Sequence, residues 1–129
     1  MNPVKKGEVY LIDLKDTYCN VQSGKRPCLI IQNNSGNTYS PTVIVVPITT
    51  KIKKTYLPVH VVVEKGVCSN KDREMILCEC ILTVSKEQLI NHLRTFDSKI
   101  MQRVDKALEV SLGIGLNRRE EYKELKIGV

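Results

Sequence analysis

The chain has 129 residues, of which 42% are hydrophobic and 26% charged, as is typical of a single soluble globular domain with its own core. No apolar run reaches the roughly 20 residues that a membrane span needs, and residues 1–8 contain no apolar signal region. We therefore expect a cytoplasmic protein with no membrane partner.

The positive charge is concentrated in the first half of the chain. Residues 1–63 carry eight Lys/Arg against three Asp/Glu, a net of +5, whereas residues 64–129 carry twelve against eleven, a net of +1. This imbalance favours a polyanionic partner bound by the first half, although a solvated surface carries the same signature. The aromatic content of 5%, with no tryptophan, argues against a row of stacking platforms for bases.

Apolar runs between Gly/Asn/Pro turn signals predict five strands, at 7–14, 27–32, 42–49, 57–64 and 74–82. Residues 33–37 predict a turn, and the loop at 15–24 has a length that is often functional. The chain is thus predicted to be α+β and mainly β, a small barrel or sandwich of antiparallel strands.

The last third changes to helical patterns. Ser85 and Gln88 have the spacing of a capping box, which predicts a short helix to about residue 93. An apolar stripe predicts a second helix from about residue 97 to Gly113. We expect one domain at 1–115, followed by a charged C-terminal tail at 116–129.

Cysteines and histidines give no sign of a metal site or a cofactor. The five cysteines are scattered without a framework, so we expect them to be reduced and structural. Cys78 and Cys80 would share one face of the predicted strand. His60 lies on a predicted strand and His92 on a predicted helix, and a lone histidine in either place is more often structural than catalytic.

A polar cluster at strand ends is the feature that carries possible chemistry. Pro27 fits the first residue of a strand, so Arg26 lies where a polar loop meets that strand; taken alone, it also fits an ordinary surface arginine. Thr49 ends another predicted strand, and in neighbouring antiparallel strands the two residues would share one rim. A guanidinium and a hydroxyl can stabilise a phosphorane without a metal when RNA supplies its own 2′-hydroxyl nucleophile.

A series of short motifs covers residues 4–112. In order they are VKKGEVY at 4–10, DL at 13–14, GKRP at 24–27, IIQN at 30–33, GN at 36–37, SPTVIV at 40–45, PIT at 47–49, LPVHV at 57–61 and ILCE at 76–79. Each motif is weak alone, but their order and spacing resemble the MazF/PemK toxin family.

This resemblance implies a small SH3-like barrel with appended C-terminal helices, and a homodimer. It also implies a metal-independent endoribonuclease toxin of a toxin–antitoxin system, an mRNA interferase that inhibits growth. Such enzymes cut single-stranded RNA at short sequences and leave 2′,3′-cyclic phosphate and 5′-hydroxyl ends. A cognate antitoxin inhibits them by laying an acidic, disordered tail across the RNA groove.

The resemblance also assigns site residues. It implies catalytic roles for Arg26 and Thr49, contacts near the scissile phosphate for Asn20 and Gln22, and contacts with bases for His60 and Glu79. From charge and proximity we add Lys25 and Lys51 as phosphate contacts.

Three positions depart from the family pattern. Val21 stands where many members carry an acid, proposed in some as the general base, and valine accepts no proton. Either catalysis here relies on Arg26 and Thr49, or the rate is poor. Cys80 and Leu82 stand where Gln and Arg are frequent, so the cleavage sequence of relatives does not transfer. A rival interpretation is a non-catalytic binding module of the same fold, either a gyrase poison or an inactive antitoxin-binding relative. The Arg26/Thr49 pair favours the nuclease, because a gyrase binder has no need of it.

Overall fold

The structure, a computed structural model, describes residues 3–15, 24–52, 57–64 and 72–115. In chain order its elements are β1 (Glu8–Asp13), β2 (Lys25–Ile30), α1 (Asn34–Tyr39), β3 (Thr42–Thr49), β4 (His60–Val63), β5 (Glu74–Leu77), β6 (Leu82–Ser85), the 3₁₀ turn η2 (Lys86–Gln88), β7 (Leu89–Thr95) and α2 (Ser98–Leu112). Among these residues no helix combines the length and apolarity that crossing a membrane requires. The predicted tail at 116–129 lies outside the described residues.

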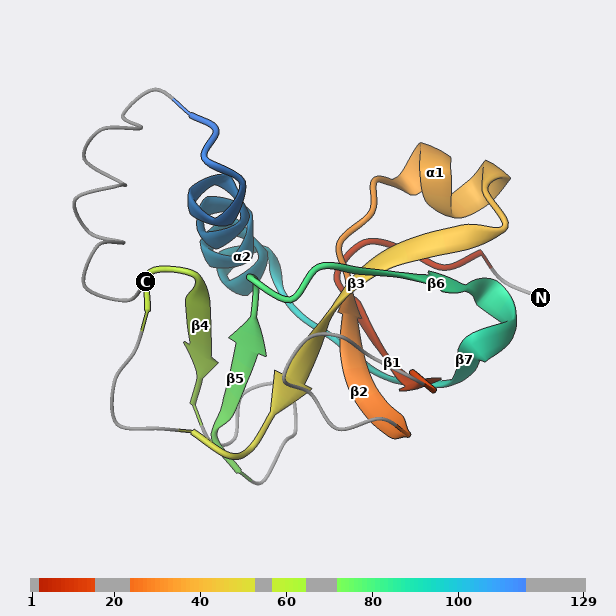
Figure 1. Ribbon diagram of the computed structural model, residues 1–129, viewed down its shortest axis with the longest axis horizontal. Coiled ribbons are helices and arrows are strands. Elements are labelled where there is room, and N and C mark those ends of the chain that lie inside the picture. Colours follow the sequence, from red (N-terminus) through yellow and green to blue (C-terminus); the bar gives the residue numbers. More distant parts are fainter. Residues whose placement is uncertain (1–2, 16–23, 53–56, 65–71, 116–129) are drawn as a thin grey trace.

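The strands form one seven-stranded antiparallel sheet with the order β4-β5-β3-β2-β1-β7, and β6 pairs with β3 beside this path. The long β3 joins the two halves: residues 42–45 pair with β6, whereas Ile48 and Thr49 pair with β5. Figure 1 shows β4, β5 and α2 in the left half of the view, and α1, β6 and β7 in the right half. The predicted mainly-β fold with a C-terminal helix is confirmed.

Both faces of the central strands are buried. A helix-side core contains Val9, Leu29, Val46, Ile48, Val61, Val63, Ile76, Cys78, Phe96, Ile100, Val104 and Ala107. A barrel-side core contains Val4, Ile12, Leu14, Cys28, Ile30, Val43, Val45 and Val84. Because successive strand side chains point to opposite faces, residues 28–30 supply both cores in turn, which explains why this run is continuously apolar instead of alternating.

Helix α2 begins and ends where the sequence predicts. The Asp97 side chain accepts a hydrogen bond from the backbone N–H of Ile100 at 2.9 Å and caps the N-terminus. Gly113 ends the helix with φ +67°, a left-handed conformation that glycine adopts without strain. Burial of Ile100, Val104 and Val110 contributes about 1.5–3 kcal/mol each relative to exposed side chains.

The predicted turn at 33–37 is wrong, because α1 occupies this stretch. Asn33 caps α1 by accepting from the backbone N–H of Gly36 at 2.8 Å. Beneath the helix, the Gln32 side-chain amide donates to Asn37 Oδ1 at 3.1 Å, and the Asn37 amide donates to the Gln32 carbonyl at 2.8 Å. The fully buried Asn37 thus has its polar atoms satisfied, and it attaches α1 to the end of β2.

The single strand predicted at 74–82 is also wrong, since the chain forms β5, a turn and then β6. Cys80 donates its backbone N–H to the Leu77 carbonyl at 3.0 Å and closes this turn. The reason lies outside the segment: β5 pairs with β4 and the end of β3, whereas β6 pairs with the start of β3. The chain must therefore cross from one end of β3 to the other.

The helix predicted at 85–93 is wrong beyond its first turn. The capping box itself is present, because the Gln88 side chain accepts from the backbone N–H of Ser85 at 2.9 Å. The turn ends at Gln88, and residues 89–95 pair with β1 as the strand β7. His92 is therefore an exposed strand residue and not a helical one.

Strand β7 contains two irregularities in its pairing with β1. Val9 pairs with Arg94 but Tyr10 pairs with His92, and Leu11 pairs with Asn91 but Ile12 pairs with Leu89. At each step β7 therefore has one extra residue, as in a β-bulge. The extra residues are Leu93 and Ile90, which are 42% and 46% exposed.

An ion pair in the interior connects β5 to β7. Arg94 Nη2 donates to Glu74 Oε2, and the two side chains are 17% and 4% exposed. The Arg94 guanidinium also lies 5.7 Å from the centre of the Phe96 ring. Two buried atoms, Glu74 Oε1 and Arg94 Nε, have no hydrogen-bond partner. The ion pair thus joins β5 to β7, although β3, β2 and β1 lie between these two strands in the sheet order.

The cysteines differ in state. Cys28 and Cys78 are free, as expected, and burial raises the pKa of each thiol to about 12. The expectation of a reduced thiol is wrong for Cys80, which is disulfide-bonded. Cys19 and Cys68 lie outside the described residues.

Candidate functional site

Arg26 and Thr49 lie at corresponding ends of β2 and β3. The two strands pair through Ile30 with Val45, Leu29 with Val46 and Cys28 with Pro47. This pairing ends at Cys28 and Pro47, so Arg26 and Thr49 each lie two residues beyond its last pair. At this level β2 still pairs with β1, through Arg26 and Ile12, whereas β3 pairs with β5, through Thr49 and Met75.

The pleat places both side chains on one face. Cys28 and Val45 belong to the barrel-side core, and residues two or four positions along a strand share a face. Arg26 therefore shares the face of Cys28, and Thr49 that of Val45. The shared rim predicted for the arginine and the hydroxyl stays a prediction.

The Thr49 hydroxyl has a defined neighbour. The backbone N–H of Lys51 donates to Thr49 Oγ1 at 3.0 Å. A hydroxyl offers one donor and two acceptor positions, so this bond uses an acceptor position and leaves the O–H available. Thr49 is half-buried, whereas Lys51 is exposed.

His60 and Glu79 form a second polar pair. His60 Nε2 lies 2.6 Å from Glu79 Oε2, and His60 Nδ1 lies 3.3 Å from the backbone nitrogen of Leu57. A backbone N–H can only donate, so Nδ1 is the acceptor and Nε2 carries the proton toward the carboxylate. The His60 side chain is 11% exposed and that of Glu79 is 37% exposed, so the histidine is fixed while the carboxylate remains accessible.

The second pair lies on the same face of the sheet as Thr49. Val61 and Ile76 point into the helix-side core, so their neighbours His60, Met75 and Leu77 point to the opposite face. Met75 pairs with Thr49, and Leu77 pairs with His60. Strand β5 thus separates Thr49 from His60, a lateral distance of about 10 Å for two strand spacings.

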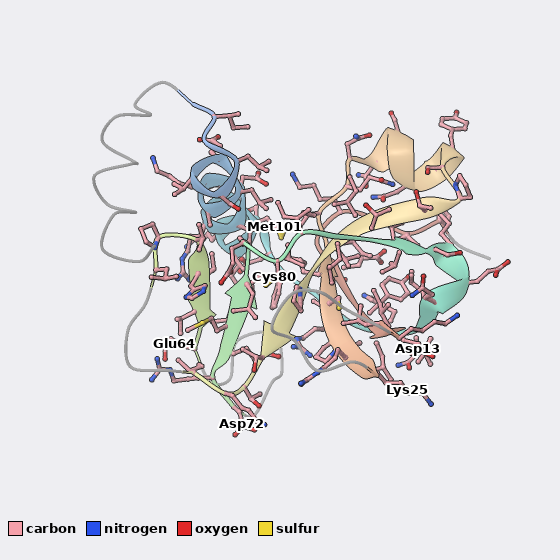
Figure 2. The ribbon with its side chains drawn as sticks, in the orientation of Figure 1. Asp13, Lys25, Glu64, Asp72, Cys80 and Met101 are labelled. Atoms are coloured by element: carbon pink, nitrogen blue, oxygen red, sulfur yellow. The ribbon has the colours of Figure 1, made fainter. Side chains whose placement is uncertain are left out.

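Two lysines stand at the strand ends beside Arg26 and Thr49. Lys25 is the first residue of β2, and Lys51 follows the end of β3 by two positions; both are exposed. Lys25 pairs with Asp13, the last residue of β1, and Figure 2 shows these two residues at the same end of the molecule. Asn20, Val21 and Gln22 lie outside the described residues.

Sequence reasoning missed the backbone groups that hold this site. The N–H groups of Leu57 and Lys51 orient His60 and Thr49, but every residue except proline has such a group, so no motif signals them. Within the described ranges, no three His, Cys, Asp or Glu side chains gather closely enough to hold a metal ion.

Comparisons with known proteins agree on one family. Residues 5–112 match the family model described as PemK-like, MazF-like toxin of type II toxin-antitoxin system. Endoribonuclease EndoA of Bacillus subtilis is 40% identical over 111 residues, which cover 86% of this chain and 96% of the relative. Endoribonuclease MazF of Staphylococcus saprophyticus is 42% identical over 111 residues, covering 86% and 92%.

Solved structures show the same fold. An endoribonuclease from Mycobacterial species superimposes with a TM-score of 0.72 at 25% identity, covering 90% of this chain and 97% of that one. A mycobacterial endoribonuclease in complex with its cognate antitoxin gives a TM-score of 0.71 at 25% identity, covering 88% and 98%. MazF from Deinococcus radiodurans gives 0.73 at 16% identity, covering 88% and 100%.

Proposed function

The chain belongs to the PemK-like, MazF-like toxin family of type II toxin–antitoxin systems, and we propose that it cuts single-stranded mRNA at short sequences without a metal ion. Its relatives are named endoribonucleases, and this chain is an endoribonuclease of the same family. The observation that supports the chemistry is that Arg26 and Thr49 lie at corresponding ends of β2 and β3, on one face and each two residues beyond the last pair of these strands.

In the proposed reaction, the 2′-oxygen of the substrate attacks the adjacent phosphorus while the bond from phosphorus to the 5′-oxygen breaks. The 2′-hydroxyl loses its proton to water and the leaving 5′-oxygen takes one from water, so the products are a 2′,3′-cyclic phosphate and a 5′-hydroxyl. Negative charge builds up on the non-bridging oxygens between these steps. The Arg26 guanidinium offers them a planar fork of donors, and the Thr49 hydroxyl adds a neutral donor.

Val21 gives this chain a particular dependence on charge stabilisation. Valine supplies no proton acceptor where many relatives have a carboxylate, so catalysis relies on Arg26 and Thr49. Asn20 and Gln22 are assigned contacts near the scissile phosphate from the resemblance alone.

The remaining site residues bind the rest of the RNA. His60 and Glu79 are proposed to contact bases, since the accessible carboxylate accepts hydrogen bonds from amino groups on base edges. Lys25 and Lys51 are proposed to contact flanking phosphates as exposed cations.

The proposal extends to regulation. A mycobacterial relative has been solved with its cognate antitoxin, and we propose that a cognate antitoxin inhibits this chain through an acidic, disordered tail. The +5 net charge of residues 1–63 favours such a tail, which would compete with RNA for the same cations. We further propose a homodimer in the cytoplasm, where mRNA is available.

The test is incubation of purified protein with a mixed-sequence single-stranded RNA in the presence of a chelator, beside the variant Arg26→Ala. We expect discrete cuts with cyclic phosphate ends, absent in the variant, while the far-ultraviolet circular dichroism of both proteins agrees. Intact RNA at high protein concentration would refute the nuclease and favour the binding module, for which inhibition of gyrase would then be measured. Cutting by Arg26→Ala at the natural rate would remove Arg26 from the mechanism.

A further inference from the structure

The hydrogen bond between Lys51 and Thr49 restricts what the threonine can do. The N–H of Lys51 points at Thr49 Oγ1 from 3.0 Å, within the usual range for an N–H···O bond. The contact joins the last residue of β3 to the segment that follows, and it depends on the main chain of Lys51 and not on its exposed amine.

An N–H that occupies one acceptor position of the hydroxyl has two consequences. First, the oxygen is a poorer proton acceptor, so Thr49 is unsuited to remove the proton from a 2′-hydroxyl. Second, the O–H must point away from the Lys51 N–H, and donation into the oxygen strengthens the outgoing bond by about 10–30% per linked bond. The arrangement makes Thr49 a donor.

We propose that Lys51 is a positioning residue, which acts on the reaction through its main-chain N–H by holding the Thr49 hydroxyl as a donor toward the phosphorane. This inference rests on the proposed nuclease function. It separates two roles of one residue: the amine binds a flanking phosphate and affects substrate affinity, whereas the N–H orients a catalytic hydroxyl and affects the chemical step.

Two substitutions at position 51 separate these roles. Lys51→Ala removes the amine and keeps the N–H, whereas Lys51→Pro removes both. We expect Lys51→Ala to raise KM with little effect on kcat. Loss of one donor in an oxyanion site lowers kcat by about 10²–10³, so loss of its orientation should lower kcat of Lys51→Pro by about 10- to 100-fold relative to Lys51→Ala, with similar KM.

The same pair of substitutions in a Thr49→Val background provides the matched control. Valine keeps the shape of threonine and removes the hydroxyl, so the proline should now cost no more than the alanine. Equal kcat for Lys51→Pro and Lys51→Ala in the natural background would overturn the proposal. An equal loss with and without the hydroxyl would also overturn it, since the proline would then act through the backbone alone.

A third variant guards against misfolding of Lys51→Pro. Replacing Lys51 by its α-hydroxy analogue turns the N–H into an ester oxygen and leaves the side chain unchanged. We expect this variant to retain the KM of the natural chain and to lose kcat about 10-fold or more, as for a mispositioned donor; an unchanged kcat would overturn the proposal. Inactivity of the natural chain, or full activity of Thr49→Val, would instead contradict the proposed function itself.

Discussion

Replacing Arg94 with methionine is expected to destabilise the fold by about 3–5 kcal/mol, because breaking a buried ion pair leaves an uncompensated charge. The Glu74 side chain is only 4% exposed, so water cannot replace the lost guanidinium. Methionine retains an unbranched apolar stem beside Phe96, which keeps the loss of packing small. Most of the expected cost therefore arises from the isolated carboxylate.

The double variant Glu74→Leu/Arg94→Met is expected to be at least as stable as the natural chain. Replacing a buried ion pair by packed apolar side chains is often neutral or stabilising by about 1–4 kcal/mol. In this pair Glu74 Oε1 and Arg94 Nε have no hydrogen-bond partner, so the attraction between the two groups offsets less of their desolvation than a bidentate contact would. The two substitutions should thus be strongly non-additive.

Urea unfolding at neutral pH gives the free energies of unfolding of Arg94→Met, Glu74→Leu and the double variant. Lys6→Met is the matched control, because Lys6 and Asp105 form an ion pair at 2.8 Å with side chains 35% and 48% exposed; such pairs contribute about 0–1 kcal/mol. A loss below about 1 kcal/mol for Arg94→Met would refute the reasoning. A double variant that costs the sum of both single variants would refute it too.

Three further predictions concern other parts of the molecule. Gly36→Ala should destabilise the protein by about 1–3 kcal/mol in urea unfolding, because the added Cβ would lie 2.9 Å from Gln32 Cδ beneath α1; an unchanged midpoint would contradict this tight contact. Lys25→Gln should lower the salt slope of RNA binding by about 0.7, measured by fluorescence anisotropy, whereas Lys99→Gln on α2 should not; equal slopes would remove Lys25 from the RNA contacts. Burial raises the pKa of Cys28 from 9.0 to about 12, so the contribution of its protonated thiol to stability is complete below pH 9 and is lost as pH rises toward 12. The free energy of urea unfolding should therefore decline less over this pH range for Cys28→Val than for the natural chain. Identical declines would contradict this prediction.

Local sequence signals predict the strands and the long helix correctly where the segments that pair or pack with them in the fold favour the same structure. The apolar runs around β2, β3 and β4 identified those strands, and Asp97 and Gly113 marked the ends of α2. The capping box of Ser85 and Gln88 was real, but the chain after it pairs with β1. A cap fixes one turn, whereas continuing as strand or helix depends on a partner far away in the sequence.

The candidate site was predictable only in its residue types. Arg26 and Thr49 follow from strand ends and from the family motifs, and strand alternation directs both to one face, two residues beyond the last β2–β3 pair. The bonds from Leu57 to His60 and from Lys51 to Thr49 depend on how loops fold back after their strands, which residue identity does not encode. The catalytic and RNA-binding roles remain predictions for the experiments above.

The two irregularities of β7 affect how this edge of the sheet meets other chains. An unpaired edge strand is a template on which a foreign strand can add and sheets can grow. Here the spacing of backbone groups is interrupted at Ile90 and at Leu93 within one seven-residue strand, so an incoming regular strand could match only short stretches of it. The protein can therefore carry two exposed apolar side chains on its edge while the backbone beneath them resists strand addition.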